Sequence, residues 1–298
     1  MDLTLLESPN WKDYELLDSG DGLKLERFGA YRFVRPEVQA MWQRGLPESV
    51  WREAHGIFRP SSEESGGHWD IKKQVDEKWK MRYAPALSPR RGIQFWAMTT
   101  PGRHLGVFPE TAAHWDWCSA LIEKAGRPTK VLNLFGYTGL ASLIAAQAGA
   151  AVTHVDASKK SVTWARDNQL LSGLEQRPIR WIVDDALKFV QREGRRGVKY
   201  DGLILDPPKF GRGPKGEVWE VYESLPELLQ ACQAVLSPAP LFFIITMYAV
   251  RASAVHLHQT LDGMLNSFNG KLDAGELVTR ETSQGRLLSQ AVYARWQA

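Results

Sequence analysis

Four short segments that could bind a ligand follow predicted strands in the second half of the chain. Asp156 comes twenty residues after Gly136 in a glycine turn, which is the usual place for a carboxylate that accepts ribose hydroxyls. An acid after the next strand can accept from an adenine amino group. The four segments, which together predict a site for an adenosine-containing ligand, are Asn133-Leu-Phe-Gly-Tyr-Thr-Gly139, Asp156-Ala-Ser158, Asp184-Asp-Ala186 and Asp206-Pro-Pro-Lys-Phe210.

The glycine turn differs from a dinucleotide-binding turn. Thr138 stands where the second close glycine of G-x-G-x-x-G would be, so only G-x-x-G remains. This turn is unsuited to a diphosphate, and it favours a phosphate-free ligand that packs against the backbone. The contacts predicted here are Asn133, Phe135, Gly136 and Gly139. Asn133 has the alternative of a simple turn residue.

The acids after the second and third strands each have a structural alternative. We assign Asp156 to the ribose, with Ala157 and Ser158 beside it, although it could also be a neighbour of a helix cap. Of Asp184 and Asp185, one is expected to cap the following helix. We assign Asp185, followed by Ala186, to the adenine.

The elements that position these segments alternate between strands and helices from about Phe108 onward. Short links between such elements predict a parallel sheet covered by helices, an α/β fold. Ligands of such sheets bind beyond the carboxyl ends of the strands. The predicted strands are 131–135, 151–156, 179–184, 202–206 and 241–246, with two more closing the chain. The predicted helices are 108–126, 138–149, 158–173, one from about 186, 217–236 and 251–268.

The first part of the chain has a different pattern. It contains short strand-like runs, such as 23–27 and 31–34, separated by turns. The chain has 12 tryptophans, eight of them in the first 117 residues. We interpret them as core side chains, with base stacking as the alternative. We therefore predict two domains: a smaller β-rich domain that selects substrate, residues 1–103, and an α/β domain, residues 104–298.

The composition sets limits on the function. A net charge of +3 permits an anionic partner such as RNA without requiring one. Cys118 and Cys232 stand alone in helix-like segments, so neither a zinc site nor a disulfide is expected. No secretory signal and no apolar stretch of membrane-spanning length occurs. These features predict a cytoplasmic protein that does not associate with membranes.

The motifs NLFGYTG, VDAS, DDA and DPPKF resemble those of class I S-adenosylmethionine-dependent methyltransferases, over residues 104–298. GVFPE and DPPKFGRG resemble the branch with the bacterial large-subunit rRNA cytosine-5 and guanine-N7 methyltransferases. The resemblance implies a Rossmann-like seven-stranded sheet whose last strand is antiparallel. It also implies S-adenosylmethionine as cofactor, with its methionine end on the glycine turn. Phe108 would then lie beside the cofactor, whereas its alternative is to start a helix.

The residues that follow the fifth predicted strand indicate which type of methyl transfer this chain can carry out. Cytosine-5 enzymes attack the base with a cysteine thiolate, but here the strand runs into Thr246-Met-Tyr248. We therefore expect direct in-line transfer, without metal, to a nucleophile that already has a lone pair. Asp206 and the carbonyl of Pro207 could accept from an amino group, and Phe210 could stack on the substrate ring. Lys209 separates the aromatic residue from the prolines, which weakens the assignment to an amino group and leaves a ring nitrogen open as the alternative target.

The predicted substrate is RNA, most simply a nitrogen of a ribosomal base. Lys209, Phe210, Arg212, Lys215 and Tyr248 are the expected substrate contacts, although Tyr248 could instead pack beneath the pocket. Arg195, Arg196 and Lys199 are expected in a solvated connecting loop. Two alternatives stay open: a methyltransferase for a small molecule or a protein side chain, and a non-catalytic module that binds the cofactor. The sequence does not indicate the oligomeric state.

Overall fold

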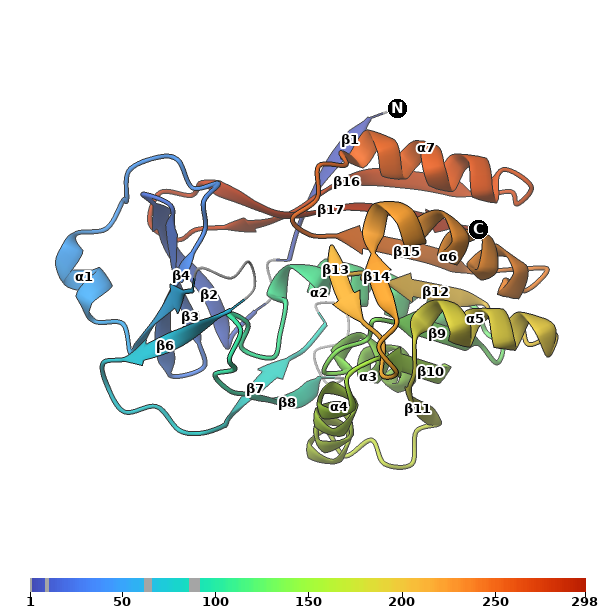
Figure 1. Ribbon diagram of the computed structural model, residues 1–298, viewed down its shortest axis with the longest axis horizontal. Coiled ribbons are helices and arrows are strands. Elements are labelled where there is room, and N and C mark those ends of the chain that lie inside the picture. Colours follow the sequence, from blue (N-terminus) through green and yellow to red (C-terminus); the bar gives the residue numbers. More distant parts are fainter. Residues whose placement is uncertain (1, 9–10, 62–65, 86–91) are drawn as a thin grey trace. The chain divides into compact units, whose positions relative to one another are not determined.

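The structure is a computed structural model that describes residues 2–8, 11–61, 66–85 and 92–298 (Figure 1). The chain divides into two compact units. The α/β unit comprises Met1–Leu6, Ala112–Leu277 and Gln290–Ala298. The N-terminal unit comprises Glu7–Thr111 and Val278–Ser289. Packing alone does not test whether residues 1–103 fold independently, so the division into 1–103 and 104–298 stays a prediction.

A large, mostly parallel sheet forms the centre of the α/β unit. In the described residues it has eight strands in the order β1-β16-β17-β15-β12-β9-β10-β11. Strands β9 to β12 and β15 pair in parallel, whereas β17 pairs with β15 in the antiparallel sense. The strands are β1 (Leu3–Glu7), β9 (Lys130–Leu134), β10 (Ala151–Asp156), β11 (Ile179–Val183), β12 (Gly202–Leu205), β15 (Phe242–Met247), β16 (Lys271–Arg280) and β17 (Leu287–Gln297).

The α/β class, the antiparallel strand and all seven expected strands are confirmed. The sheet also contains an eighth strand that was not expected, because β1 lies beside β16 at its edge. Gly275 of β16 makes this possible, since a Cβ there would clash with the backbone of Thr4. A single short strand at the N-terminus carries no local sign of the sheet that it joins.

Helices cover both faces of this sheet. Along β12, Leu203 and Leu205 pack into one core with α5 to α7, whereas Ile204 packs into another with α2 and α3. This alternation is the two-residue period of a strand buried on both sides. The helices are α2 (Ala112–Lys124), α3 (Leu140–Gln147), α4 (Lys159–Leu171), α5 (Ala186–Arg195), α6 (Val221–Val235) and α7 (Ala254–Leu265).

The segment before α6 differs from the prediction. Residues 217–220 were expected to begin a helix, but Val218–Glu220 forms β14, which pairs with β13 (Phe210–Arg212) in a small hairpin. Glu220 then caps α6 by accepting from the backbone N–H of Glu223 at 3.1 Å. This segment is too short for the spacing of its apolar residues to distinguish a strand from the first turn of a helix.

The N-terminal unit is built from short strands, as predicted. Its two described sheets have the orders β2-β3-β4-β5-β6 and β7-β8. Trp51 and Trp79 are buried, which confirms a core role for these two tryptophans. Its elements are β2 (Tyr14–Gly20), β3 (Leu23–Phe28), β4 (Tyr31–Pro36), α1 (Glu48–Arg52), β5 (Gly56–Pro60), β6 (Gly67–Ile71), β7 (Trp79–Tyr83), β8 (Ile93–Ala97) and the 3-10 helix η1 (Pro109–Thr111).

The connection between β16 and β17 belongs to the N-terminal unit because Asp18 binds it. The buried carboxylate of Asp18 accepts from Ser283 Oγ at 2.6 Å, from the Leu46 N–H at 2.7 Å and from Trp51 Nε1 at 3.0 Å. These hydrogen bonds lower the pKa of Asp18 despite its desolvation. Across all described residues, no helix is both long and apolar enough to span a bilayer.

Candidate functional site

Strand register brings the predicted ligand segments to one edge of the large sheet. Leu134 pairs with Val155 on one side and with Leu205 on the other. The next residues along the three strands are therefore Phe135, Asp156 and Asp206, at the carboxyl edge of neighbouring parallel strands. Adjacent strands lie about 4.8 Å apart, so these groups can contact one small ligand together.

The glycine turn after β9 follows a tightly constrained path. Phe135 and Tyr137 have positive φ angles of 56° and 49°, and Gly139 has 83°. Positive φ in non-glycine residues costs about 1–3 kcal/mol and often marks functional sites. Gly136 is required for a different reason: a Cβ there would clash with the ring of His154.

A buried polar network supports this turn from below. Asn133 Nδ2 donates to Ser142 Oγ at 2.9 Å, and Ser142 Oγ lies 3.0 Å from His154 Nδ1. Burial lowers the pKa of His154 to about 3, so the ring is neutral at physiological pH. The Asn133 amide N is thus already used inside the protein, and a ligand contact of this residue stays a prediction.

Asp156 binds two backbone N–H groups of the protein and keeps acceptor sites that a ligand could use. One carboxylate oxygen accepts from the Tyr137 N–H and the other from the Ser158 N–H, both at 2.8 Å. A carboxylate has about four acceptor sites, so each oxygen can still accept one ligand hydroxyl. Burial raises the pKa of Asp156 above its ordinary value, although both N–H groups favour the charged form.

The two acids after β11 have distinct surroundings. Asp184 is engaged on both oxygens, by the Asp185 N–H at 2.9 Å and by Arg192 Nη2 at 2.6 Å. Asp185 is the helix cap, since its Oδ1 accepts from the Lys188 N–H at 2.9 Å. Its other oxygen makes no hydrogen bond to any described residue. Capping and adenine binding are therefore compatible in Asp185, whose ligand role stays a prediction, as does that of Ala186 beside it.

Trp219 fixes the loop that follows β12, and sequence reasoning missed it. Its Nε1 donates to the carbonyl of Pro208 at 2.7 Å. Its ring centroid lies 4.9 Å from that of Phe135 on the glycine turn. Buried on β14, Trp219 thus joins the Asp206-Pro-Pro segment to the turn. No sequence motif marks it, because both contacts reach residues distant in the chain.

The β13–β14 hairpin presents most of the predicted substrate residues. Phe210 is 54% exposed, and Lys209 Nζ lies 5.4 Å from the centre of its ring. Arg212 and Lys215 are exposed on the same hairpin. Glu217 ties the hairpin to α5 through an ion pair with Lys188 at 2.7 Å.

Tyr248 and Phe108 lie in other surroundings. Tyr248 packs against the apolar cluster of Leu277, Ala291 and Tyr293, the arrangement of its non-ligand alternative. Phe108 belongs to the N-terminal unit, where its carbonyl accepts from the Thr111 N–H at 3.2 Å at the start of η1. Substrate contact by Tyr248 and cofactor contact by Phe108 stay predictions.

Neither cysteine is suited to attack a substrate. Cys118 and Cys232 are fully buried in α2 and α6. Burial raises the pKa of the Cys118 thiol to about 12 and that of Cys232 further still. Both thiols therefore stay protonated, and a thiolate is the form that acts as nucleophile.

Comparison with known proteins identifies the family. A family model described as S-adenosylmethionine-dependent methyltransferase matches residues 92–262. The chain belongs to this family. Its cofactor is S-adenosylmethionine, and the predicted α/β methyltransferase fold is confirmed.

Curated relatives of this methyltransferase are bacterial. The ribosomal RNA large subunit methyltransferase K/L of Hahella chejuensis is 31% identical over 182 residues, which cover 58% of this chain and 24% of that protein. The protein of the same name from Shewanella sp. strain W3-18-1 is 35% identical over 195 residues, covering 65% and 26%. The chain thus spans about a quarter of the length of these relatives.

Solved structures share the whole fold. A methyltransferase from Agrobacterium tumefaciens is 47% identical with a TM-score of 0.91, and the alignment covers 99% of this chain and 93% of that one. A methyltransferase complexed with S-adenosylhomocysteine is 18% identical with a TM-score of 0.74, covering 97% and 76%. At this identity the second likeness shows the fold alone.

The residues at the carboxyl edge fit S-adenosylmethionine. Asp156 has one spare acceptor site on each oxygen, which would suit the two hydroxyls of a ribose. Gly136 lets the turn pack directly on the buried ring of His154, because a Cβ there would clash with that ring. Carboxylates at this edge suit a ligand whose sulfur is positively charged.

Proposed function

We propose that this methyltransferase transfers a methyl group to a nitrogen of an RNA base, with ribosomal RNA as substrate. The observation that carries the proposal is the Asp206-Pro-Pro-Lys-Phe210 segment, which follows β12 at the carboxyl edge and leads into a hairpin with an exposed aromatic ring and exposed cations. Stacking on an aromatic ring is worth about 1–3 kcal/mol per base. The curated relatives are named as ribosomal RNA methyltransferases, which supports the substrate class.

The chemistry that we propose is direct in-line transfer without a cysteine adduct. Bound S-adenosylmethionine supplies an electrophilic methyl carbon on a cationic sulfur. The nitrogen lone pair would form the new N–C bond as the C–S bond breaks and its electron pair stays on sulfur, and a nitrogen that carries hydrogen would then release a proton to solvent. The two buried, protonated cysteines support this route over a covalent one.

The protein contributes mainly position. Asp206 and the Pro207 carbonyl would accept hydrogen bonds from the substrate and align its lone pair, while Phe210 stacks on the base. Asp156 and Asp185 would hold the ribose and the adenine, and Trp219 would keep the Asp206 loop at a fixed distance from the glycine turn. Correct alignment of reacting groups can supply about 7–11 kcal/mol of the barrier.

We further propose that the N-terminal unit helps to select the RNA, and that the protein acts in the cytoplasm, where ribosomal RNA is found. Arg212 and Lys215 would contact phosphates, which position the substrate without reading its sequence.

The deciding experiment compares modified nucleosides in rRNA from a deletion strain and its parent by mass spectrometry. We expect one methylated nucleoside to disappear and to return with the wild-type gene but not with an Asp206→Asn variant. In parallel, calorimetry with S-adenosylhomocysteine and tritium transfer to deproteinised rRNA are measured on the purified protein. Cofactor-product binding without transfer to any nucleic acid would indicate a small-molecule or protein substrate, or a non-catalytic module, and would overturn the proposal.

A further inference from the structure

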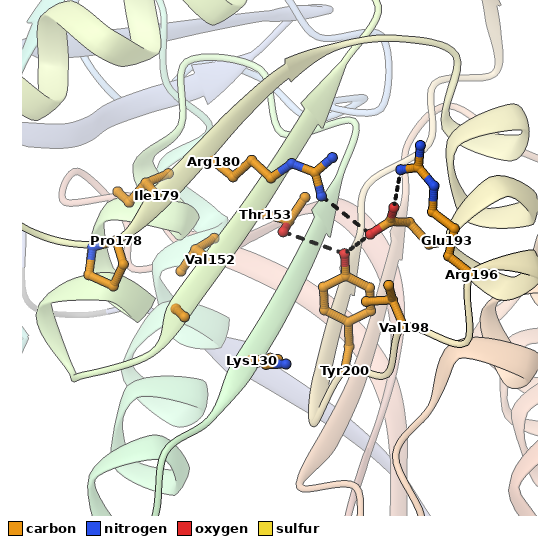
Figure 2. Close-up of a pocket in the computed structure, with 11 residues that line it drawn as sticks. Lys130, Val152, Thr153, Pro178, Ile179, Arg180, Glu193, Arg196, Val198 and Tyr200 are labelled. Carbon is orange, nitrogen blue, oxygen red and sulfur yellow. Dashed lines mark hydrogen bonds and ion pairs between the residues drawn. The ribbon is translucent and has the colours of Figure 1, made fainter.

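The α/β unit contains a cavity at the edge of the sheet opposite the cofactor motifs. It has a volume of about 540 Å³ and lies where β9, β10 and β11 begin (Figure 2). Lys130, Val152 and Ile179 line it from these strands, and the end of α5 closes one side. Small-molecule sites typically measure about 300–1,000 Å³. The cavity is therefore large enough for a ligand of its own.

Polar side chains of the cavity bind one buried carboxylate, that of Glu193. Glu193 is 1% exposed and lies 3.4 Å from Arg180 Nη1 through one oxygen and 3.3 Å from Arg196 Nη1 through the other (Figure 2). Tyr200 donates its hydroxyl proton to Glu193 at 2.8 Å. Desolvation raises the pKa of Tyr200, so the phenol keeps that proton. Two guanidinium groups are thus held beside a single carboxylate.

Most donors of these two arginines remain available to a ligand. A guanidinium has five N–H donors, and each of these uses one on Glu193, with no other hydrogen bond to the described residues. Their side chains are 49% and 55% exposed. Lys130 also lines the cavity and adds a third cation to it. Arg196 lies in the turn after α5 and is exposed, as expected, and it also pairs with Glu193, whereas Arg195 belongs to α5 and not to the connecting loop.

The remaining walls are apolar. Val152, Pro178, Ile179, Val198 and the ring of Tyr200 line the cavity. A ligand that contacts both the arginines and the apolar walls would need an anionic group for the arginines and a flat, weakly polar ring for the walls. Guanidinium groups match phosphate oxygens in geometry and charge.

We propose that this cavity is a second ligand site that binds a nucleotide, with its phosphate on Arg180 and Arg196 and its base against the apolar wall. The nucleotide is either free in solution or part of an RNA chain. The site does not depend on the proposed methyl-transfer function, because no residue of the carboxyl edge takes part in it.

The test measures binding of uridine 5′-monophosphate to the full chain saturated with S-adenosylhomocysteine, by calorimetry. Uridine monophosphate lacks the adenine of the cofactor, and saturation blocks the cofactor site. We expect one nucleotide per chain, with uridine binding about tenfold more weakly or worse because it lacks the charge-assisted hydrogen bonds. No binding of the nucleotide at millimolar concentration, or binding that S-adenosylhomocysteine prevents, would overturn the proposal.

Variants locate the site. The double variant Arg180→Gln, Arg196→Gln should weaken nucleotide binding by about tenfold or more, with affinity for S-adenosylhomocysteine unchanged. The matched control, Arg166→Gln with Arg195→Gln, removes two exposed arginines whose side chains form no hydrogen bond or ion pair with the described residues, and it should leave nucleotide binding unchanged. Equal weakening in both double variants would show a general charge effect and contradict the site.

Lys130→Gln provides a milder probe in case the double variant fails to fold, since Lys130 is exposed. We expect about threefold weaker nucleotide binding from the loss of one exposed charge, and unchanged binding would contradict the site. A competition experiment then shows whether the site binds a free nucleotide or a nucleotide within RNA. Displacement of the nucleotide by an RNA oligonucleotide indicates a nucleotide within RNA, and displacement by mononucleotides alone indicates a free one.

Discussion

The two edges of the large sheet carry opposite charges. At the carboxyl edge, Asp156, Asp185 and Asp206 follow the strands. At the amino edge, Arg180, Arg196 and Lys130 line the cavity around Glu193. In a parallel sheet each connecting helix begins near the carboxyl edge and ends near the amino edge. Backbone N–H groups at a helix start stabilise anions, and carbonyl groups at a helix end stabilise cations.

This difference shows in individual contacts. Asp185 caps the start of α5 at one edge, whereas Arg195 and Arg196 lie at its end. The same helix therefore favours acids toward the cofactor edge and bases toward the cavity. One edge suits a ligand with a cationic sulfur, and the other suits an anion. Four substitutions test this difference between the two edges.

The largest effect is expected at Asp206. The substitution Asp206→Asn keeps the size of the side chain but weakens it as a hydrogen-bond acceptor for the substrate. Misalignment of reacting groups can cost about 10²-fold in rate, and we expect a loss of that size in single-turnover transfer to rRNA. The control Asp262→Asn, an exposed residue of α7, should transfer normally. A normal rate in the Asp206 variant would remove this residue from the catalytic machinery.

Asp156→Asn should weaken cofactor binding next most strongly. Hydrogen bonds to a charged group contribute about 1.5–3 kcal/mol, so we expect about 10- to 100-fold weaker binding of S-adenosylhomocysteine in calorimetry. Asp167→Asn, exposed on α4, is the matched control. Because burial raises the pKa of Asp156, wild-type affinity should already fall at a pH above the ordinary aspartate range, and the Asn variant should lack this dependence. A variant with wild-type affinity would contradict ribose binding by this acid.

The carboxyl edge should also be the more acid-sensitive one, because His154 supports the glycine turn. Its pKa is about 3 in the folded protein against an ordinary value of 6.5. Between these values the unfolded chain binds more protons, so the free energy of unfolding falls as the pH drops below 6.5. The loss from this group is about 1.4 kcal/mol one pH unit below its ordinary pKa.

Urea unfolding at neutral and mildly acidic pH measures this effect. His154→Asn keeps a polar group beside Ser142 but does not titrate, so its stability should depend less on pH than that of the wild type. His114, also buried with a pKa near 3, contributes equally in both proteins and serves as internal background. Identical pH profiles would show that His154 does not carry the acid sensitivity.

The smallest effect is expected for Trp219→Phe, which removes only the hydrogen bond to Pro208 and keeps an aromatic ring near Phe135. A neutral hydrogen bond contributes about 1 kcal/mol, so we expect kcat to fall about fivefold. The KM for S-adenosylmethionine should stay the same, since Trp219 acts on the Asp206 loop and not on the ribose. A change in KM alone would place Trp219 on the cofactor side instead.

Prediction from sequence succeeded where the information is local. The strand ends at Asp156 and Asp206 and the glycine turn were all found, because each motif lies within a few residues of its strand. It failed where a segment is short or its partner distant. Strand β1 joins a sheet formed almost entirely by the other end of the chain, and β14 occupies residues expected in a helix.

The alternation of the main strands and helices after residue 108 and the chemical groups at the carboxyl edge follow from the sequence, because hydrophobic period and strand-end residues are properties of neighbouring positions. The contacts of Trp219 with Phe135, of His154 with Gly136, and of Glu193 with two arginines and Tyr200 do not follow from it. These contacts join residues from different elements, and they exist only when helices and strands pack at particular distances.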